Sequence, residues 1–241
     1  MKNKTMEAPE ISYCLPAFNS SARIERCLGG VLAQVHAARE ILVVDNASTD
    51  DTVAKARALL QDVPGARIVV NEKNLGRVEN WNRCLELASG HYLKFALAND
   101  VLRPGGADML LEAARATPEV SMVCSKECRV EAVPEVATPA PKNPEKNIFA
   151  PRETLQHLAK YNNDTGSLGG ILINGEVVRK NKLRFRENIP FWSDFYFSIQ
   201  LAALGNTVYV DAESYYFDTS VKGRFANAGT GAKSRSLCFE A

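Results

Sequence analysis

The 241-residue chain is 46% hydrophobic and 24% charged, which is ordinary for a globular protein, and its formal net charge of +1 offers no general attraction to nucleic acid. No apolar run approaches the roughly 20 residues that span a bilayer, and the N-terminal lysines are not followed by the apolar core of a secretory signal. We therefore expect a cytoplasmic protein with no transmembrane segment.

The first half of the chain alternates short apolar runs with amphipathic stretches. The runs predict strands at residues 11–15, 41–45, 67–71, 92–97 and 120–124, and the stretches predict helices at 20–34, 51–61, 76–88 and 106–116. The helix at 76–88 is the clearest, because its apolar residues recur at steps of three and four and Gly90 ends the run. This alternation predicts right-handed crossovers and a mostly parallel sheet with helices on both faces, a three-layer α/β/α fold.

The pattern breaks near Pro134, where residues 134–147 are rich in proline and lysine and predict a long exposed loop. Helices at 151–161 and 193–204 and a strand at 207–210 follow, and we expect the last dozen residues to be poorly ordered. The part after the loop is too short for a core of its own, so we expect a single domain over residues 1–241.

The six cysteines are scattered, and several lie inside apolar runs, as buried free thiols do. They stand at positions 14, 27, 84, 124, 128 and 238. Cys124 and Cys128 are not followed by a second Cys or His pair, so their spacing does not predict a zinc site.

Polar residues follow the predicted strands of the first half. In parallel sheets, ligands bind outside the carboxyl ends of the strands. Asp45 ends its apolar run abruptly, and a carboxylate there suits the N3–H of a uracil or the hydroxyls of a ribose. The alternative is a helix cap, although Ser48 and its neighbours are also available for capping.

Three further positions have both a binding and a plain structural interpretation. Phe18 lies in the loop opened by Pro16, where an aromatic ring either stacks on a base or anchors the core. Asn74 and Gly76 precede a helix, which suits a base or phosphate contact or a simple turn. Asp100, beside Asn99, is a candidate hard-oxygen ligand for Mg²⁺ or Mn²⁺, or part of an ordinary turn.

Together these motifs resemble the family 2 inverting glycosyltransferases, which have the GT-A fold of the nucleotide-diphospho-sugar transferases. The family's Pro-x-Tyr-Asn motif corresponds here to Pro16-Ala17-Phe18-Asn19, and its Val-Asp-Asp-Gly-Ser-x-Asp motif corresponds to VVDNASTDD from Val43. Its Asn-x-Gly motif corresponds to Asn74-Leu75-Gly76, and its Asp-Asp motif corresponds to Asn99-Asp100. The order and spacing of the motifs cover residues 11–105 almost continuously, with a weaker likeness to about residue 210.

The resemblance implies a nucleotide-sugar-binding half at 11–105, an acceptor-binding half at 106–225 and a tail at 226–241. It implies that Phe18 stacks on the base, that Asp45 contacts it, and that Asp100 coordinates Mn²⁺ or Mg²⁺ at the diphosphate. The donor site it implies comprises Pro16, Ala17, Phe18, Asn19, Asp45, Asn74, Gly76 and Asn99. The catalytic base by resemblance is Asp194, at the start of a helix in PFWSDFYFSIQLAALG.

The implied reaction is transfer of a sugar from a UDP-sugar to a hydroxyl of a glycan or lipid-linked acceptor, as in polysaccharide biosynthesis. The implied location is the cytoplasm, with or without peripheral attachment to the inner face of the membrane. Loops 133–147 and 162–170 are expected to border the acceptor cleft. Asn99 and Ser193 stand where many members have an acid, so the alternative is a weakened or inactive homologue that binds a sugar nucleotide. A dehydrogenase or a nucleotidyltransferase is not favoured, because LPAFNSS has no glycine.

Overall fold

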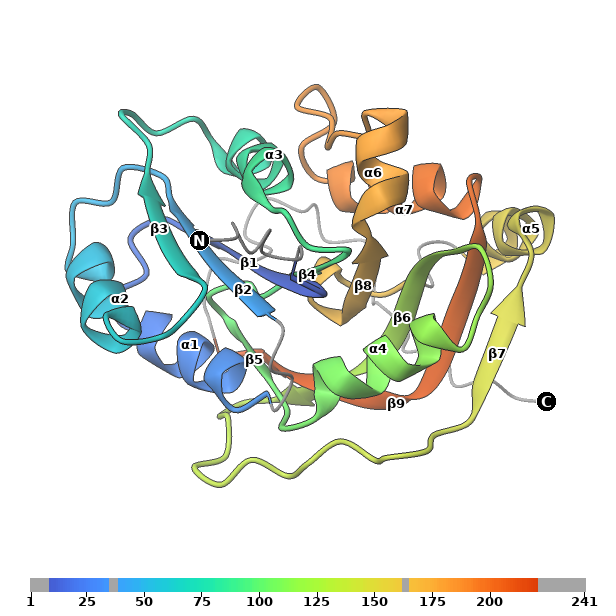
Figure 1. Cartoon of the computed structure of the whole chain (residues 1–241), viewed down its shortest axis with the longest axis horizontal. Helices are drawn as coiled ribbons and strands as arrows, with labels where there is room; N and C mark the ends of the chain where they lie inside the picture. The colour runs from blue at the N-terminus through green and yellow to red at the C-terminus, as the bar shows by residue number, and fades with distance from the viewer. Residues whose placement is uncertain (1–8, 35–38, 162–164, 221–241) are drawn as a thin grey trace, which may run out of the picture.

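The computed structural model describes residues 9–34, 39–161 and 165–220, and its first half follows the predicted alternation of strands and helices (Figure 1). The elements are β1 (Ile11–Ala17), α1 (Ile24–Leu32), β2 (Arg39–Asp45), α2 (Thr52–Leu60), β3 (Ala66–Val70), α3 (Arg77–Leu87) and β4 (Tyr92–Phe95). Each of them lies where the sequence predicts it, with bounds that differ by at most a few residues.

The second half contains predicted and unpredicted elements. They are β5 (Asp100–Leu102), α4 (Gly106–Arg115), β6 (Val120–Val130), β7 (Lys146–Phe149), α5 (Pro151–Tyr161), the short 3₁₀ helix η1 (Leu168–Gly170), β8 (Ile171–Asn174), α6 (Gly175–Asn181), α7 (Ser193–Ala202) and β9 (Asn206–Asp218). The predictions of α4, α5, α7, β6 and β9 are confirmed. The sequence missed β5, β7, β8 and α6, because runs of three to seven residues are too short to show a period.

The strands form one sheet in the order β3-β2-β1-β4-β8-β6-β9-β5, with β7 paired to β9. The pairs β1–β2, β2–β3, β1–β4 and β6–β9 are parallel, whereas β5, β7 and β8 pair with their neighbours in the antiparallel sense. Strands β1, β2, β3, β4, β6 and β9 therefore all run in one direction, which confirms the mostly parallel sheet.

Helices cover both faces of the sheet and bury two hydrophobic cores (Figure 1). On one face, residues of α1, α2 and α4 form a core that includes Tyr13 and Leu15 from β1. On the other face, residues of α3, α5, α6 and α7 form a core that includes Cys14 and Phe95. Neighbouring residues of a strand point to opposite faces, so β1 contributes to both cores. This arrangement confirms the three-layer α/β/α prediction.

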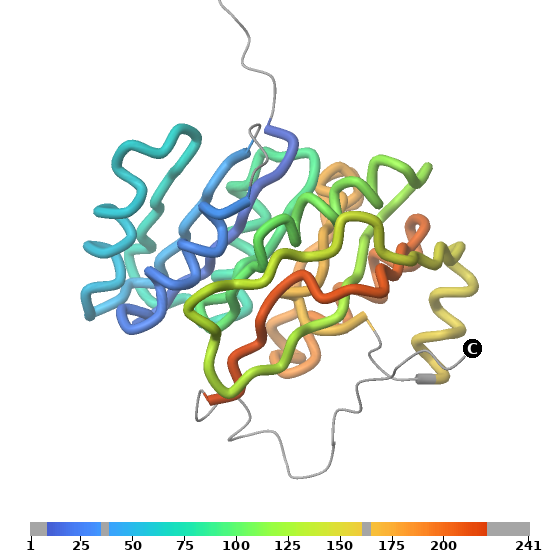
Figure 2. Tube along the Cα trace, turned by 90° about the horizontal axis from the view of Figure 1, so that it is seen from below, coloured from blue at the N-terminus to red at the C-terminus, as the bar shows by residue number. Residues whose placement is uncertain are grey.

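The segment between β6 and β7 is a long, mostly exposed loop, as predicted, and it lies beside β9 (Figure 2). The Thr138 N–H donates a hydrogen bond of 2.9 Å to the Tyr216 hydroxyl, and the Asp211 N–H donates one of 2.8 Å to the Glu145 carbonyl. Arg103, which follows β5, donates to the Thr138 carbonyl at 2.9 Å. The loop is thus tied to β9 and to the residue that follows β5.

The cysteines within the described ranges are free thiols, and Cys14, Cys27, Cys84 and Cys124 are buried, as expected. Among residues 9–34, 39–161 and 165–220, no helix is both long enough and apolar enough to cross a membrane. The predicted tail at 226–241, residues 162–164 and Cys238 lie outside the described residues.

Candidate functional site

The carboxyl ends of β1, β2 and β4 meet at one edge of the sheet. Ala17 at the end of β1 lies opposite Asp45 at the end of β2, and Cys14 lies opposite Phe95 at the end of β4. Because these strands are parallel neighbours in register, the segments that follow them leave the sheet on the same side. The backbone therefore brings the three predicted strand ends together, although they are tens of residues apart in sequence.

Asn19 ties the loop after β1 to the loop after β2. Its backbone N–H donates to Ser48 Oγ at 2.9 Å, and its Oδ1 accepts from the Thr49 N–H at 2.9 Å. It adopts a φ of 46°, a left-handed conformation that asparagine tolerates better than most residues. The neighbouring Phe18 is 46% exposed, so its ring does not anchor the core. Its stacking on a base stays a prediction.

Asp45 is fully buried and organises the turn after β2. Its Oδ2 accepts from the Ser48 N–H at 2.9 Å and its Oδ1 from the Ser48 hydroxyl at 2.5 Å. It does not cap α2, whose N-cap position is Asp51. An ionised carboxylate accepts about four hydrogen bonds, so the bonds to Ser48 leave acceptor capacity on Asp45. Contact with a base stays a prediction.

An asparagine network, which sequence reasoning missed, holds the segment that precedes α3. The Asn46 amide donates to Asn74 Oδ1 at 2.8 Å, and its oxygen accepts from the Leu75 N–H at 2.9 Å and from Asn71 Nδ2 at 3.1 Å. Asn74 Oδ1 also accepts from the Gly76 N–H at 2.8 Å. The predicted Asn74 and Gly76 are therefore fixed to the end of β2 through Asn46, the residue directly after Asp45.

The predicted metal-binding pair lies where β5 leaves the turn after β4. Asp100 is only 3% exposed, and its Oδ2 lies 2.6 Å from the position that a Cβ on Gly169 would occupy. The carboxylate therefore faces the interior, against η1. Asn99 Oδ1 is also buried, and within the described part of the chain it has no hydrogen-bond partner.

A fully buried lysine, Lys94, lies beside Asp100 and was also missed. Its ammonium group donates to the Gly169 carbonyl and lies 5.8 Å from the centre of the Tyr215 ring. Burial lowers the pKa of Lys94 to about 7, against the opposing effect of the Asp100 charge. The Tyr215 hydroxyl donates to Glu127 Oε2 at 2.8 Å. The signal in the sequence is a single lysine in the apolar run YLKFAL.

Asp194 is the second residue of α7, so it does not occupy the N-cap position, which belongs to Trp192. Burial raises the pKa of Asp194. The hydrogen bond of 2.9 Å from the Phe195 N–H to its Oδ1 and the charge of Arg77 oppose that rise. Asp194 is therefore a half-buried carboxylate whose pKa lies above its usual value, and its role as a general base stays a prediction.

Arg77, the first residue of α3, connects the two halves of the chain. Its Nη2 donates to the Pro190 carbonyl at 2.6 Å, in the loop that leads to α7. Its guanidinium carbon lies 5.2 Å from the centre of the Trp81 ring, one helical turn further on. Asp194 is thereby linked to the segment that contains Asn74 and Gly76. Sequence reasoning did not single out Arg77.

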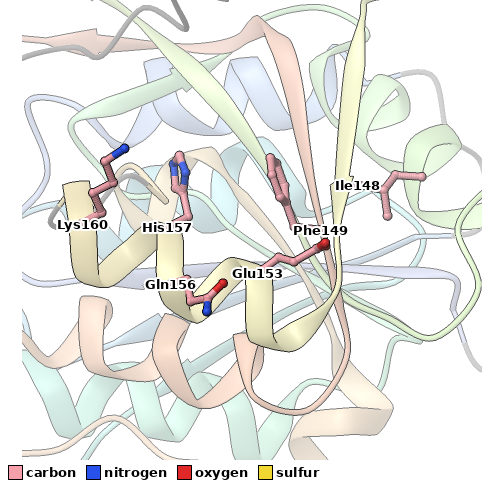
Figure 3. A pocket seen from close by; sticks show the side chains of 6 residues that line it. All are labelled: Ile148, Phe149, Glu153, Gln156, His157 and Lys160. Atoms are coloured by element: carbon pink, nitrogen blue, oxygen red, sulfur yellow. The ribbon is translucent and has the colours of Figure 1, made fainter.

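A surface hollow of about 380 Å³ lies elsewhere, between β7 and α5 (Figure 3). It is lined by Ile148, Phe149, Glu153, Gln156, His157 and Lys160. None of the predicted site residues lines it. β7 pairs with residues 207–210 at the beginning of β9, so the hollow is not at the edge where β1, β2 and β4 end.

The sequence is similar to that of known glycosyltransferases. The family model for Glycosyl transferase family 2 matches residues 12–212, which is most of the chain. An uncharacterised glycosyltransferase of Haemophilus influenzae is 22% identical over 204 residues, which cover 82% of this chain and 61% of that protein. The chain spans only part of the curated relatives it matches, 31% and 61% of the length of two of them.

Solved structures share the fold. S. aureus TarS in complex with UDP-GlcNAc superposes with a TM-score of 0.67 at 20% identity, over 86% of this chain and 58% of that one. The mannosyltransferase PcManGT from Pyrobaculum calidifontis, in complex with GDP-Man and Mn²⁺, has a TM-score of 0.64 at 17% identity, over 91% of this chain and 59% of that one. These matches confirm the predicted GT-A fold.

Proposed function

The chain belongs to glycosyl transferase family 2, and on that premise we propose that it moves a sugar from a UDP-sugar to a hydroxyl of a glycan or lipid-linked acceptor, with inversion at the anomeric carbon. The observation that carries the proposal is the shared edge at which β1, β2 and β4 end, with the α7 loop tied to it through Arg77. A UDP donor is supported by the complex of TarS with UDP-GlcNAc. A cytoplasmic location, with or without attachment to the membrane, is part of the proposal.

On the donor side, we assign binding of the nucleobase to Phe18 and Asp45. An exposed ring in a loop fixed by hydrogen bonds is suited to stacking, because little conformational freedom is lost on binding. Asp45 would accept a hydrogen bond from the base or ribose with the capacity that Ser48 leaves open. The segments Pro16–Asn19 and Asn74–Gly76 would form the two walls around them.

A divalent cation fits the turn at Asn99 and Asp100. A carboxylate and an amide oxygen are hard ligands of the kind that Mn²⁺ and Mg²⁺ prefer, and Asn99 Oδ1 is a buried acceptor with no hydrogen-bond partner in the described ranges. Those ranges contain no cluster of three or more His, Cys, Asp or Glu side chains suited to a metal ion. Asn99 and Asp100 are the residues that would hold the ion. When bound, the ion would stabilise charge on the leaving diphosphate. PcManGT is a structural relative with Mn²⁺.

On the acceptor side, Asp194 would act as the general base. The acceptor oxygen forms a bond to the anomeric carbon as the bond to the diphosphate oxygen breaks, and the hydroxyl proton passes to the Asp194 carboxylate. Asp194 must be unprotonated to accept it. Because burial raises the pKa of Asp194, turnover should fall, as pH is lowered, at a higher pH than an ordinary aspartate would give. A profile of kcat against pH measures this fall on the acidic side.

The direct test is Asp194→Asn, with exposed Asp62→Asn as the matched control. Loss of the general base should reduce kcat roughly 10²–10⁴-fold and leave the affinity for UDP unchanged. The control variant should match the wild type. Transfer of sugar from UDP-GlcNAc and related donors is the measurement. Turnover by Asp194→Asn near the wild-type rate would remove Asp194 from the mechanism.

Asn99 favours one alternative, a homologue that binds a sugar nucleotide without transferring the sugar. The site offers one carboxylate, Asp100, where many members have two. Hydrolysis of a UDP-sugar in the presence of Mn²⁺ separates the two functions. Measurable hydrolysis supports transfer, whereas binding without turnover across a broad donor and acceptor panel supports the alternative.

A further inference from the structure

We propose that Arg77 is a positioning residue that couples the donor-side segment before α3 to the loop carrying Asp194. The expected effect of Arg77 on turnover rests on the proposed function. The structural part of the proposal, that Arg77 holds the loop at 186–193, can be tested without turnover.

The donor-side end of this link is rigid. Gly76, directly before Arg77, has a φ of 85°, and its carbonyl accepts from the Asn80 N–H at 3.1 Å and from the Asn46 amide at 3.3 Å. Asn46 in turn follows the last residue of β2. Arg77 therefore starts from backbone that is fixed to the edge of the sheet where the donor is proposed to bind.

The guanidinium group is oriented before it reaches the loop. Trp81 lies four residues after Arg77, on the same side of α3, and its ring lies under the guanidinium at 5.2 Å. From there Nη2 donates to the Pro190 carbonyl at 2.6 Å. A charged donor makes a stronger hydrogen bond than a neutral one, so this contact is suited to hold a loop against the helix.

The loop that receives Arg77 is a compact turn leading directly to Asp194. The Trp192 N–H donates to the Ile189 carbonyl at 3.0 Å, and the Arg186 N–H donates to Ser193 Oγ at 2.6 Å. Ser193 begins α7 and precedes Asp194. A shift of the loop away from Arg77 would therefore move the start of α7, and with it the carboxylate that is to accept the proton.

The variants are Arg77→Ala and Arg77→Lys, and the control is Arg83→Ala, which removes an exposed arginine of the same helix that pairs with Glu86 at 3.1 Å. Hydrogen exchange of the amides in 186–193 should be about tenfold faster or more in Arg77→Ala, as expected for loss of a hydrogen bond to a charged group. UDP affinity should stay within about twofold by calorimetry. With a UDP-sugar and acceptor that the wild type uses, kcat should fall by up to about 10²-fold, the scale of a misplaced catalytic group.

The other variants distinguish a positioning role of Arg77 from a direct role in donor binding. Arg77→Lys keeps a cationic donor and should recover part of both the exchange protection and kcat, and Arg83→Ala should match the wild type. Unchanged exchange in Arg77→Ala overturns the proposal. So does a loss of UDP affinity with exchange unchanged, which would make Arg77 a donor-binding residue. If the wild type transfers no sugar, the proposed function fails while the exchange result still decides whether Arg77 holds the loop.

Discussion

Lys94 and Asp100 are both buried, and both side chains lie against the backbone of Gly169. The lysine donates to the Gly169 carbonyl, and the Asp100 carboxylate lies where a side chain on that glycine would be. A buried charge without its partner is costly. The charge of Asp100 opposes the effect of burial on the pKa of Lys94, so each charge is expected to stabilise the other.

We predict that removing either charge destabilises the protein by about 3–5 kcal/mol, as for other buried pairs that lose one partner. Lys94→Met and Asp100→Leu, alone and together, form a double-mutant cycle that urea unfolding can measure. The double variant should lose much less stability than the sum of the single variants. The exposed pair Arg83–Glu86 is the control and should show a coupling of about 0–1 kcal/mol. Additive losses at Lys94 and Asp100 would show that the two charges do not interact.

The sequence identified many individual polar positions at the strand ends, but not their partners. Asp45 and Asn19 stand out because a polar residue directly follows an apolar run. Lys94 was missed because a lysine inside a strand has no periodic signature. Its proximity to the charge of Asp100 depends on β5 leaving β4 to join β9. Arg77 was missed for a similar reason, since its partner Pro190 is 113 residues away.

Between elements, the connection of β2 to α3 depends on side chains more than on backbone pairing. The Asn46 side chain takes part in four hydrogen bonds, which reach Asn71, Asn74, Leu75 and Gly76. The segment before α3 has no ladder to a neighbouring strand, so these bonds define its position relative to the sheet edge.

Asn46→Ala should therefore destabilise the protein by about 1–3 kcal/mol, the cost of leaving buried polar groups unsatisfied. It should also weaken UDP binding, because the Asn74–Gly76 wall is no longer fixed. Asn181→Ala is the control: that amide bonds only the Val177 carbonyl of its own helix, on the surface, and its loss should cost less than about 0.5 kcal/mol. Thermal unfolding with and without UDP measures both effects. Equal behaviour of the two variants would contradict the role given to Asn46.

At the level of elements, periodicity was sufficient for the longer helices and for the strands of the first half, but it predicted only residues 120–124 of β6 and 207–210 of β9. The βαβ units of the first half were predicted because each strand is an apolar run and each helix has one apolar face. β8 has only four residues and runs antiparallel between β4 and β6, and nothing local to Ile171–Asn174 indicates those neighbours. Its place is set by long-range pairing, which a single sequence does not reveal.

The whole molecule combines a rigid, sheet-based donor edge with an acceptor side made of α7 and the loops around it. The two cores on opposite faces fix the sheet, and the carboxyl ends of β1, β2 and β4 are consequently fixed with it. The loop between β6 and β7 is tied to β9 and Arg103. The chemistry proposed here needs both sides. The contacts between them include the hydrogen bond of Arg77 with Pro190 and the hydrogen bonds of Asn82 with the backbone of Phe185.

The measurement that tests this account most directly is calorimetric titration of UDP, with Mn²⁺, into the wild type, Phe18→Ala and Asp45→Asn. Ile148→Ala, which removes a 49% exposed isoleucine on β7, away from the donor edge, is the control. We predict that the wild type and the control bind UDP equally. Phe18→Ala should weaken binding about 2–10-fold, the range expected for lost stacking, and Asp45→Asn at least about tenfold, for a lost charged hydrogen bond. UDP binding that is unaffected by both substitutions would show that the nucleotide does not bind at the ends of β1 and β2.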